Sequence, residues 1–246
     1  MNYRTLLLST AVAMLATSAT AFEFTGGDAT LRYTRWSEGG FSENNTDFGA
    51  SARFTFGAGF GLETGLNYTD LDVADEDLKT LSLLGTYALS PALQLGLFYD
   101  TTWIMDDTIK YYGIEARYTR DNISLGGFWG QGDFPGGPGK PDVYGADIGY
   151  DMGNGFDFGL FYRAEDLFGA EFSEYGLSAG YQIAGISTQP VYLNAEYGRF
   201  DLFGSELDQF GISITVPFGN QGQKGRKPAH PHSIYMSLLP LMFSGG

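Results

Sequence analysis

Acidic and arginine side chains recur at alternate positions inside otherwise apolar stretches of this sequence. In an extended chain, alternate positions share one face, so these charges would gather on one side of a sheet. The charged set consists of Arg53, Glu63, Asp100, Glu115, Arg117, Asp147, Asp157, Arg163, Glu174 and Glu196. Opposite charges in a narrow aqueous space pair with each other and set ion preference. Two interpretations stay open: a selectivity ring that favours cations, and structural pairs that only solvate a polar interior.

Large aromatic side chains fall on the same alternate positions. They are Phe98, Tyr111, Phe128, Phe161 and Phe200. Such a group could form an aromatic constriction or an apolar entrance for hydrophobic solutes. It could equally form a packed plug that seals the interior, and the sequence does not decide between these readings.

Enzyme and metal chemistry find little support. Both histidines, His230 and His232, follow the last predicted strand, so no histidine base lies among the alternating charges. Paired acids abound, but no spacing singles out a hydrolase pair. The acidic run at 72–77 lacks the spacing of a dedicated calcium loop and is expected to be a solvated loop. We therefore expect no enzyme, no metal site and no cofactor.

The elements that would position these residues are predicted strands with a period of two. Phe48, Ala50, Ala52 and Phe54 alternate with polar residues, which is typical of a strand with one apolar face. The same pattern predicts strands at 29–36, 48–56, 62–68, 81–89, 93–99, 112–118, 123–129, 144–150, 156–162, 175–181, 191–197 and 210–218. The sequence therefore predicts an all-β chain of about twelve strands.

The predicted links between strands alternate in length. Short links at 57–61, 90–91, 119–122 and 151–155 interleave with longer, more acidic ones at 37–46, 70–77 and 132–142. Tight turns at one rim and acidic loops at the other are typical of transmembrane antiparallel up-and-down β-barrels. By hairpin counting, Arg163 should lie opposite Glu174, and Arg53 should lie diagonal to Glu63.

The apolar faces would then contact lipid, and the aromatic residues that close many strands would lie at the headgroup level. A soluble sandwich or lipocalin-like barrel is the alternative, with its apolar face inside. Lysine is nearly absent from the strands and the polar face is rich in glycine, which favours a lumen. The first strand fits least well, because Trp36 is out of phase with Leu31 and Tyr33, and a bulge could restore the register.

The ends of the chain differ from its middle. Arg4, the apolar run from Leu6 to Ala16 and the small residues Ala19 and Ala21 predict a signal peptide over 1–21, cleaved near Ala21. Residues 22–218 would form the barrel, and 219–246 a tail that is disordered or lies on the membrane surface. The chain has no cysteine, and its formal charge of −15 opposes nucleic-acid binding.

The export signal, the repeated hairpins and the last strand, Gly211 to Phe218, together resemble the outer-membrane porin superfamily of Gram-negative bacteria. This resemblance implies a bacterial outer-membrane location and passive diffusion of small hydrophilic solutes or ions. The excess of acidic residues on the wall and the rim predicts a preference for cations. The expected partners are outer-membrane lipid, lipopolysaccharide, the β-barrel assembly machinery and a second copy of the chain. The alternative function is a closed structural or surface-interaction barrel with acidic external loops.

Two features depart from that family. Its chains usually end at the aromatic residue that closes the final strand, whereas here residues 219–246 follow Phe218. The family also folds a long third loop into the lumen, and the segment 101–108 is too short for this. Any constriction is therefore expected to come from the side chains of the wall.

Overall fold

The computed structural model describes residues 22–38, 41–57, 59–71, 76–104, 107–135, 139–167, 169–183, 190–202 and 205–219. The predicted signal peptide, 1–21, and all of the predicted tail beyond residue 219 lie outside these residues. No helix among the described residues is long and apolar enough to cross a membrane.

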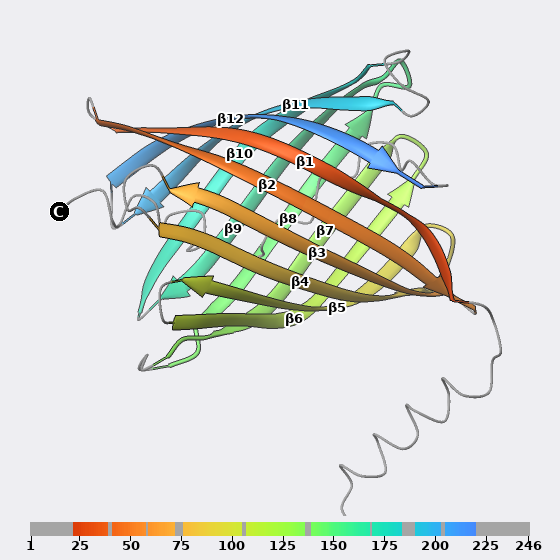
Figure 1. Cartoon of the computed structure of the whole chain (residues 1–246), viewed down its shortest axis with the longest axis horizontal. Coiled ribbons are helices and arrows are strands. Elements are labelled where there is room, and N and C mark those ends of the chain that lie inside the picture. The colour runs from red at the N-terminus through yellow and green to blue at the C-terminus, as the bar shows by residue number, and fades with distance from the viewer. Residues whose placement is uncertain are drawn as a thin grey trace, which may run out of the picture.

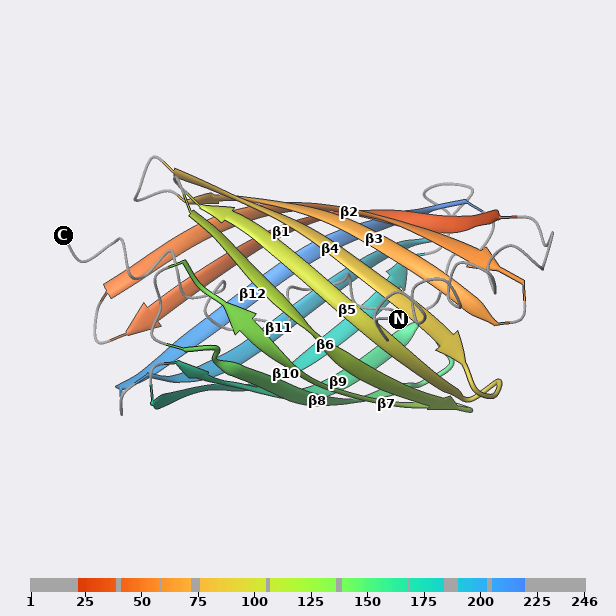
Figure 2. The same ribbon diagram turned by 90° about the horizontal axis from the view of Figure 1, so that it is seen from below.

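Twelve strands form one closed antiparallel barrel, in which every strand pairs with its neighbours in sequence and β1 pairs with β12 (Figure 1). The strands are β1 (Glu23–Glu38), β2 (Phe41–Phe56), β3 (Phe60–Leu71), β4 (Glu76–Ala88), β5 (Leu93–Ile104), β6 (Asp107–Arg120), β7 (Ile123–Asp133), β8 (Asp142–Asp151), β9 (Phe156–Leu167), β10 (Ala170–Ile183), β11 (Val191–Leu202) and β12 (Ser205–Phe218). The strands are strongly tilted against the barrel axis (Figure 2). The predicted fold class and strand count are confirmed.

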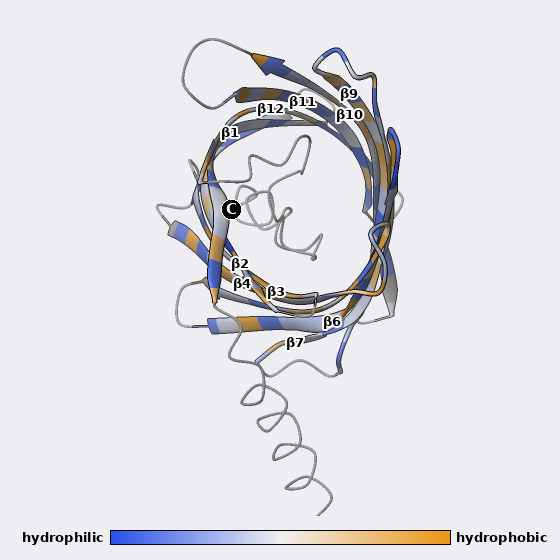
Figure 3. Ribbon diagram, turned by 90° about the vertical axis from the view of Figure 1, so that its right-hand side faces the viewer, coloured by the Kyte–Doolittle hydropathy of each residue, from blue (hydrophilic) through white to orange (hydrophobic). Residues whose placement is uncertain are grey.

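The alternation predicted from sequence separates the two faces of the wall. Large apolar side chains such as Leu66, Leu97 and Ile114 project from the outer surface, where Leu97 is 68% exposed. Figure 3 shows apolar and polar residues alternating along the strands around the ring. A soluble sandwich or a lipocalin-like barrel would turn these side chains to its interior, so their outward position excludes that alternative.

We call the two ends of the barrel the proximal and distal rims. The proximal rim holds the start of β1, the end of β12 and the connections from β2 to β3, β4 to β5, β6 to β7, β8 to β9 and β10 to β11, and the distal rim holds the others. The predicted contrast between short and long links is largely wrong. The expected loop at 37–46 is mostly strand, because β1 and β2 stay paired to their ends, Glu38 with Phe41. At 70–77, β3 and β4 pair up to Leu71 and Glu76.

β1 corrects the expected position of its bulge. The register between β1 and β2 shifts between Phe24 and Gly26, at the proximal end, and is regular from there to Glu38. Trp36 therefore belongs to the inward face, and it is only 1% exposed. Leu31 and Tyr33 lie on the outward face of the same strand, because successive residues of a strand point to opposite faces. Trp36 is therefore out of phase with them although the strand is regular.

The outer surface carries different aromatic groups at the two rims. Near the distal rim, tyrosine hydroxyls donate hydrogen bonds to the adjacent strand in the pairs Tyr33–Asn44, Tyr68–Asp77 and Tyr197–Asp208, and across β9 from β8 to β10 in the pair Tyr144–Glu171. Near the proximal rim, rings pack on each other, as in Phe22 with Phe54, Phe60 with Tyr87 and Phe156 with Tyr181. Aromatic girdles at two levels flank the apolar band, as expected of a membrane barrel.

In the connection between β7 and β8, Lys140 Nζ donates a 2.9 Å hydrogen bond to the Tyr112 hydroxyl and lies over its ring. This hydrogen bond raises the pKa of Lys140 above its usual value.

Candidate functional site: the inner wall

All ten charged residues singled out from the sequence occupy inward-facing positions of their strands. The wall carries further charges that the sequence analysis left out. They include Asp28 and Arg32 on β1, Glu43 and Asp47 on β2 and Glu165 on β9. Acidic side chains outnumber basic ones on this face, so the field inside the barrel is negative.

Arg53 joins three strands near the proximal rim. It lies directly opposite Glu63 in the register of β2 and β3, and Arg53 Nε is 3.4 Å from Glu63 Oε2. The predicted diagonal placement is wrong, because the hairpin closes with Phe56 paired to Phe60, which is a tighter turn than expected. Arg53 Nη2 also donates to Asp28 Oδ2, which accepts a 2.9 Å hydrogen bond from Ser51 as well.

Arg163 and Glu174 form a second pair near the middle of the barrel. They lie opposite each other across β9 and β10, as predicted, with Arg163 Nη1 3.6 Å from Glu174 Oε2. The Arg163 guanidinium also lies 5.2 Å from the centre of the Phe161 ring. Both arginines are thus held against the wall by neighbouring strands.

Several inward carboxylates lie over a glycine on the neighbouring strand. Glu115 is opposite Gly96, and a Cβ at that glycine would lie 2.6 Å from Glu115 Cγ. Asp147 covers Gly126 in the same way, and Asp157 covers Gly180. These acids lie along the wall, over the neighbouring strand. The inner surface is therefore charged, and these side chains do not extend toward the barrel axis.

The inward aromatic residues use the same arrangement. Phe98 lies over Gly113 and Gly130, where an added Cβ would be 2.6 Å from its Cζ. Phe128 lies over Gly145 and Phe161 over Gly176, with corresponding distances of 2.5 and 2.6 Å. These rings therefore reach sideways over neighbouring strands, and the inward glycines leave room for them.

Apolar packing is strongest toward the distal rim. On β4 to β8 a buried cluster contains Leu78, Leu84, Phe98, Ile104, Ile109, Tyr111 and Val143. The Tyr111 hydroxyl donates a 2.5 Å hydrogen bond to Glu165 Oε1. On the other side, Phe200 packs against Trp36 with ring centres 4.7 Å apart. The distal half of the inner wall is thus the more apolar half.

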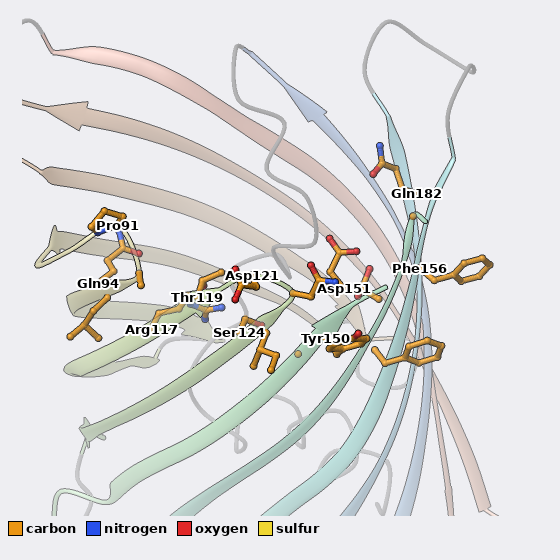
Figure 4. A pocket seen from close by; sticks show the side chains of 18 of the residues that line it. Pro91, Gln94, Arg117, Thr119, Asp121, Ser124, Tyr150, Asp151, Phe156 and Gln182 are labelled. Atoms are coloured by element: carbon orange, nitrogen blue, oxygen red, sulfur yellow. The ribbon is translucent and has the colours of Figure 1, made fainter. Parts of the chain in front are cut away.

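The proximal rim is more polar and surrounds a cavity of about 580 Å³. Its lining includes Gln94, Arg117, Ser124, Asp157 and Tyr192. Figure 4 shows Arg117 and Ser124 on neighbouring strands, with Asp151 and Gln182 farther along the same rim. The ring of Phe156 points away from the cavity, toward the outer surface.

Among the described residues, no three histidine, cysteine, aspartate or glutamate side chains gather as a metal site requires. The residues that sequence reasoning missed had a usable signal. Extending the alternation of β2 back from Asp47 reaches Glu43, and that of β1 back from Thr30 reaches Asp28. Both precede the predicted strands, because 37–46 is interpreted as a loop and the first strand begins only at residue 29.

Comparisons with known proteins place the fold. No family model matches this sequence, and no curated protein matches it. Among solved structures, the KdgM porin in complex with disordered oligogalacturonate has a TM-score of 0.61 at 10% identity, covering 78% of this chain and 99% of KdgM. The NanC porin has a TM-score of 0.58 at 9% identity, covering 76% and 98%. An outer-membrane channel from Pseudomonas putida F1 has a TM-score of 0.54 at 12% identity, covering 82% and 98%.

Proposed function

We propose that the protein is an outer-membrane channel for passive diffusion of small hydrophilic solutes or ions. Its fold, a closed barrel of twelve antiparallel strands, is similar to that of small outer-membrane porins. One observation carries this proposal: the inner-wall rings of Phe98, Phe128 and Phe161 reach sideways over glycines of neighbouring strands. Rings in this position take up wall and not axis, which favours a passage over a packed plug.

The passage is proposed to prefer cations. The inner wall carries more carboxylates than guanidinium groups, and two of the arginines, Arg53 and Arg163, are engaged by carboxylates. Fixed negative charge in a narrow aqueous pore raises the local concentration of cations and lowers that of anions.

The proposed location is the bacterial outer membrane, after removal of a signal peptide near Ala21. The apolar outer surface and the two aromatic girdles support membrane insertion. Outer-membrane lipid, lipopolysaccharide and the β-barrel assembly machinery are the proposed partners, and a second copy of the chain is possible at the outer surface.

Planar-bilayer recording of the refolded protein tests the proposal. Reproducible single-channel steps are expected, and under a salt gradient the reversal potential should have the sign of cation selectivity. Anion selectivity would contradict the charge argument. A silent bilayer with correctly folded protein would overturn the channel and favour a closed barrel with a structural or surface-interaction role.

A further inference from the structure

Arg117 and Asp147 flank one glycine of the inner wall, Gly126, from its two sides. Arg117 lies opposite Gly126 in the register of β6 and β7, and Asp147 lies opposite the same glycine in that of β7 and β8. Two strand spacings, about 10 Å, therefore separate their backbones. The Asp147 carboxylate leans over Gly126, on the side toward Arg117.

These two charges do not pair in the structure. The ion pairs of the described residues include Arg53, Arg163 and Arg199 on the strands, but neither Arg117 nor Asp147 takes part in one. Arg117 Nε is buried and has no hydrogen-bond partner among the described residues. A buried guanidinium nitrogen without an acceptor is costly, so a ligand that supplies one gains affinity.

The surroundings supply further polar contacts. Arg117 lines the proximal cavity together with Gln94, Ser124 and Tyr192. Tyr192 is only 8% exposed, and its hydroxyl also lacks a hydrogen-bond partner among the described residues. Gly149, the next inward residue after Asp147 on β8, belongs to the same lining, so Asp147 lies at the inner edge of the cavity.

We propose that this place is a binding subsite for small zwitterions of the α-amino acid type. Arg117 binds the carboxylate of the solute with its forked donors, and Asp147 binds the ammonium group across Gly126. In amino acids with polar side chains, Tyr192 and Gln94 of the same cavity lining hydrogen-bond to the side chain. A ligand with charges a few ångströms apart fits between two opposite charges that do not reach each other. The inference rests on the proposed function in one respect, since it assigns a solute class to the channel.

Saturation-transfer difference NMR on the full chain in detergent tests the subsite with L-alanine as the probe. Propionate lacks the ammonium group and ethylamine lacks the carboxylate, so both should bind much more weakly than L-alanine. Arg117→Gln and Asp147→Asn should each weaken L-alanine binding by about tenfold, because each removes a charge-assisted hydrogen bond.

Arg120→Gln is the matched control. Arg120 lies three residues from Arg117 at the end of the same strand, and its side chain is 72% exposed in the solvent at the rim. This variant should bind L-alanine like the original protein. Equal binding of L-alanine and propionate, or unchanged binding in Arg117→Gln and Asp147→Asn, would overturn the subsite.

The channel and the subsite fail separately. If bilayers show open channels and L-alanine does not bind, only the subsite is refuted. If bilayers are silent and L-alanine binds with the predicted dependence on Arg117 and Asp147, the subsite stands and the channel does not.

Discussion

Arg163 on β9 lies directly opposite Glu174 on β10, and the guanidinium and the carboxylate are 3.6 Å apart on the inner wall. The Glu174 side chain is 2% exposed and that of Arg163 is 14% exposed. If one partner were removed, hydration of the remaining charge could therefore replace little of the lost ion-pair interaction. This pair ties two neighbouring strands together in the half of the wall where Phe161 also packs.

Glu174→Gln should lower the free energy of unfolding by about 1–3 kcal/mol, because it leaves the Arg163 charge in a poorly solvated place. Urea titration of the protein in detergent micelles, followed by circular dichroism, measures this change. The control is Glu206→Gln, which removes a partner of the exposed Arg199. It should change the same quantity by less than about 1 kcal/mol. Equal effects of the two variants would contradict the assignment of Arg163 and Glu174 as a structural pair.

Gly145→Ala should lower single-channel conductance. A Cβ at this position would lie 2.5 Å from Phe128 Cε1 and 2.8 Å from the Tyr162 carbonyl oxygen, so the ring has to move away from the wall and the backbone has to shift slightly. The double variant Gly145→Ala with Phe128→Ala removes the ring and should recover most of the conductance.

The control for this experiment is Gly85→Ala, at an outward-facing position where the nearest atom to a new Cβ is 4.0 Å away. Its conductance should match that of the original protein. Unchanged conductance in Gly145→Ala would argue against the position of the Phe128 ring over Gly145 as the reason for an open passage.

Neutralising acids on the inner wall should weaken cation preference. Combined Glu115→Gln and Glu196→Gln removes two inward charges with little change of side-chain volume. The reversal potential under a salt gradient should shift toward zero, because less fixed negative charge remains in the pore. Asp70→Asn removes a charge from the outward face of β3 and should shift it less. A larger shift from Asp70 would place the selectivity outside the lumen.

Two of the three tryptophans should report membrane contact differently. Trp129 is 50% exposed on the outer surface, whereas Trp36 is buried inside the barrel. In single-tryptophan variants reconstituted with brominated lipids, Trp129 fluorescence should be strongly quenched and Trp36 fluorescence nearly unchanged. Quenching of Trp36 as strong as that of Trp129 would contradict the assignment of the two faces.

Pairing across hairpins was predictable wherever the turn length was right. Arg163 opposite Glu174 follows from counting outward from a correctly placed hairpin. Arg53 was offset from Glu63 because a three-residue connection between Phe56 and Phe60 was taken as longer. A register prediction requires the correct turn length, since one residue more or less in the turn shifts every pair along the ladder.

The sequence by itself determined the number of strands and the face on which most side chains lie, because alternation of apolar and polar residues has one consequence in a β-strand. It did not determine which glycine lies under Phe128, or that Arg117 and Asp147 flank one glycine without meeting. Those relationships join residues on different strands. They depend on register and closure around the whole ring, and only the tertiary structure decides them.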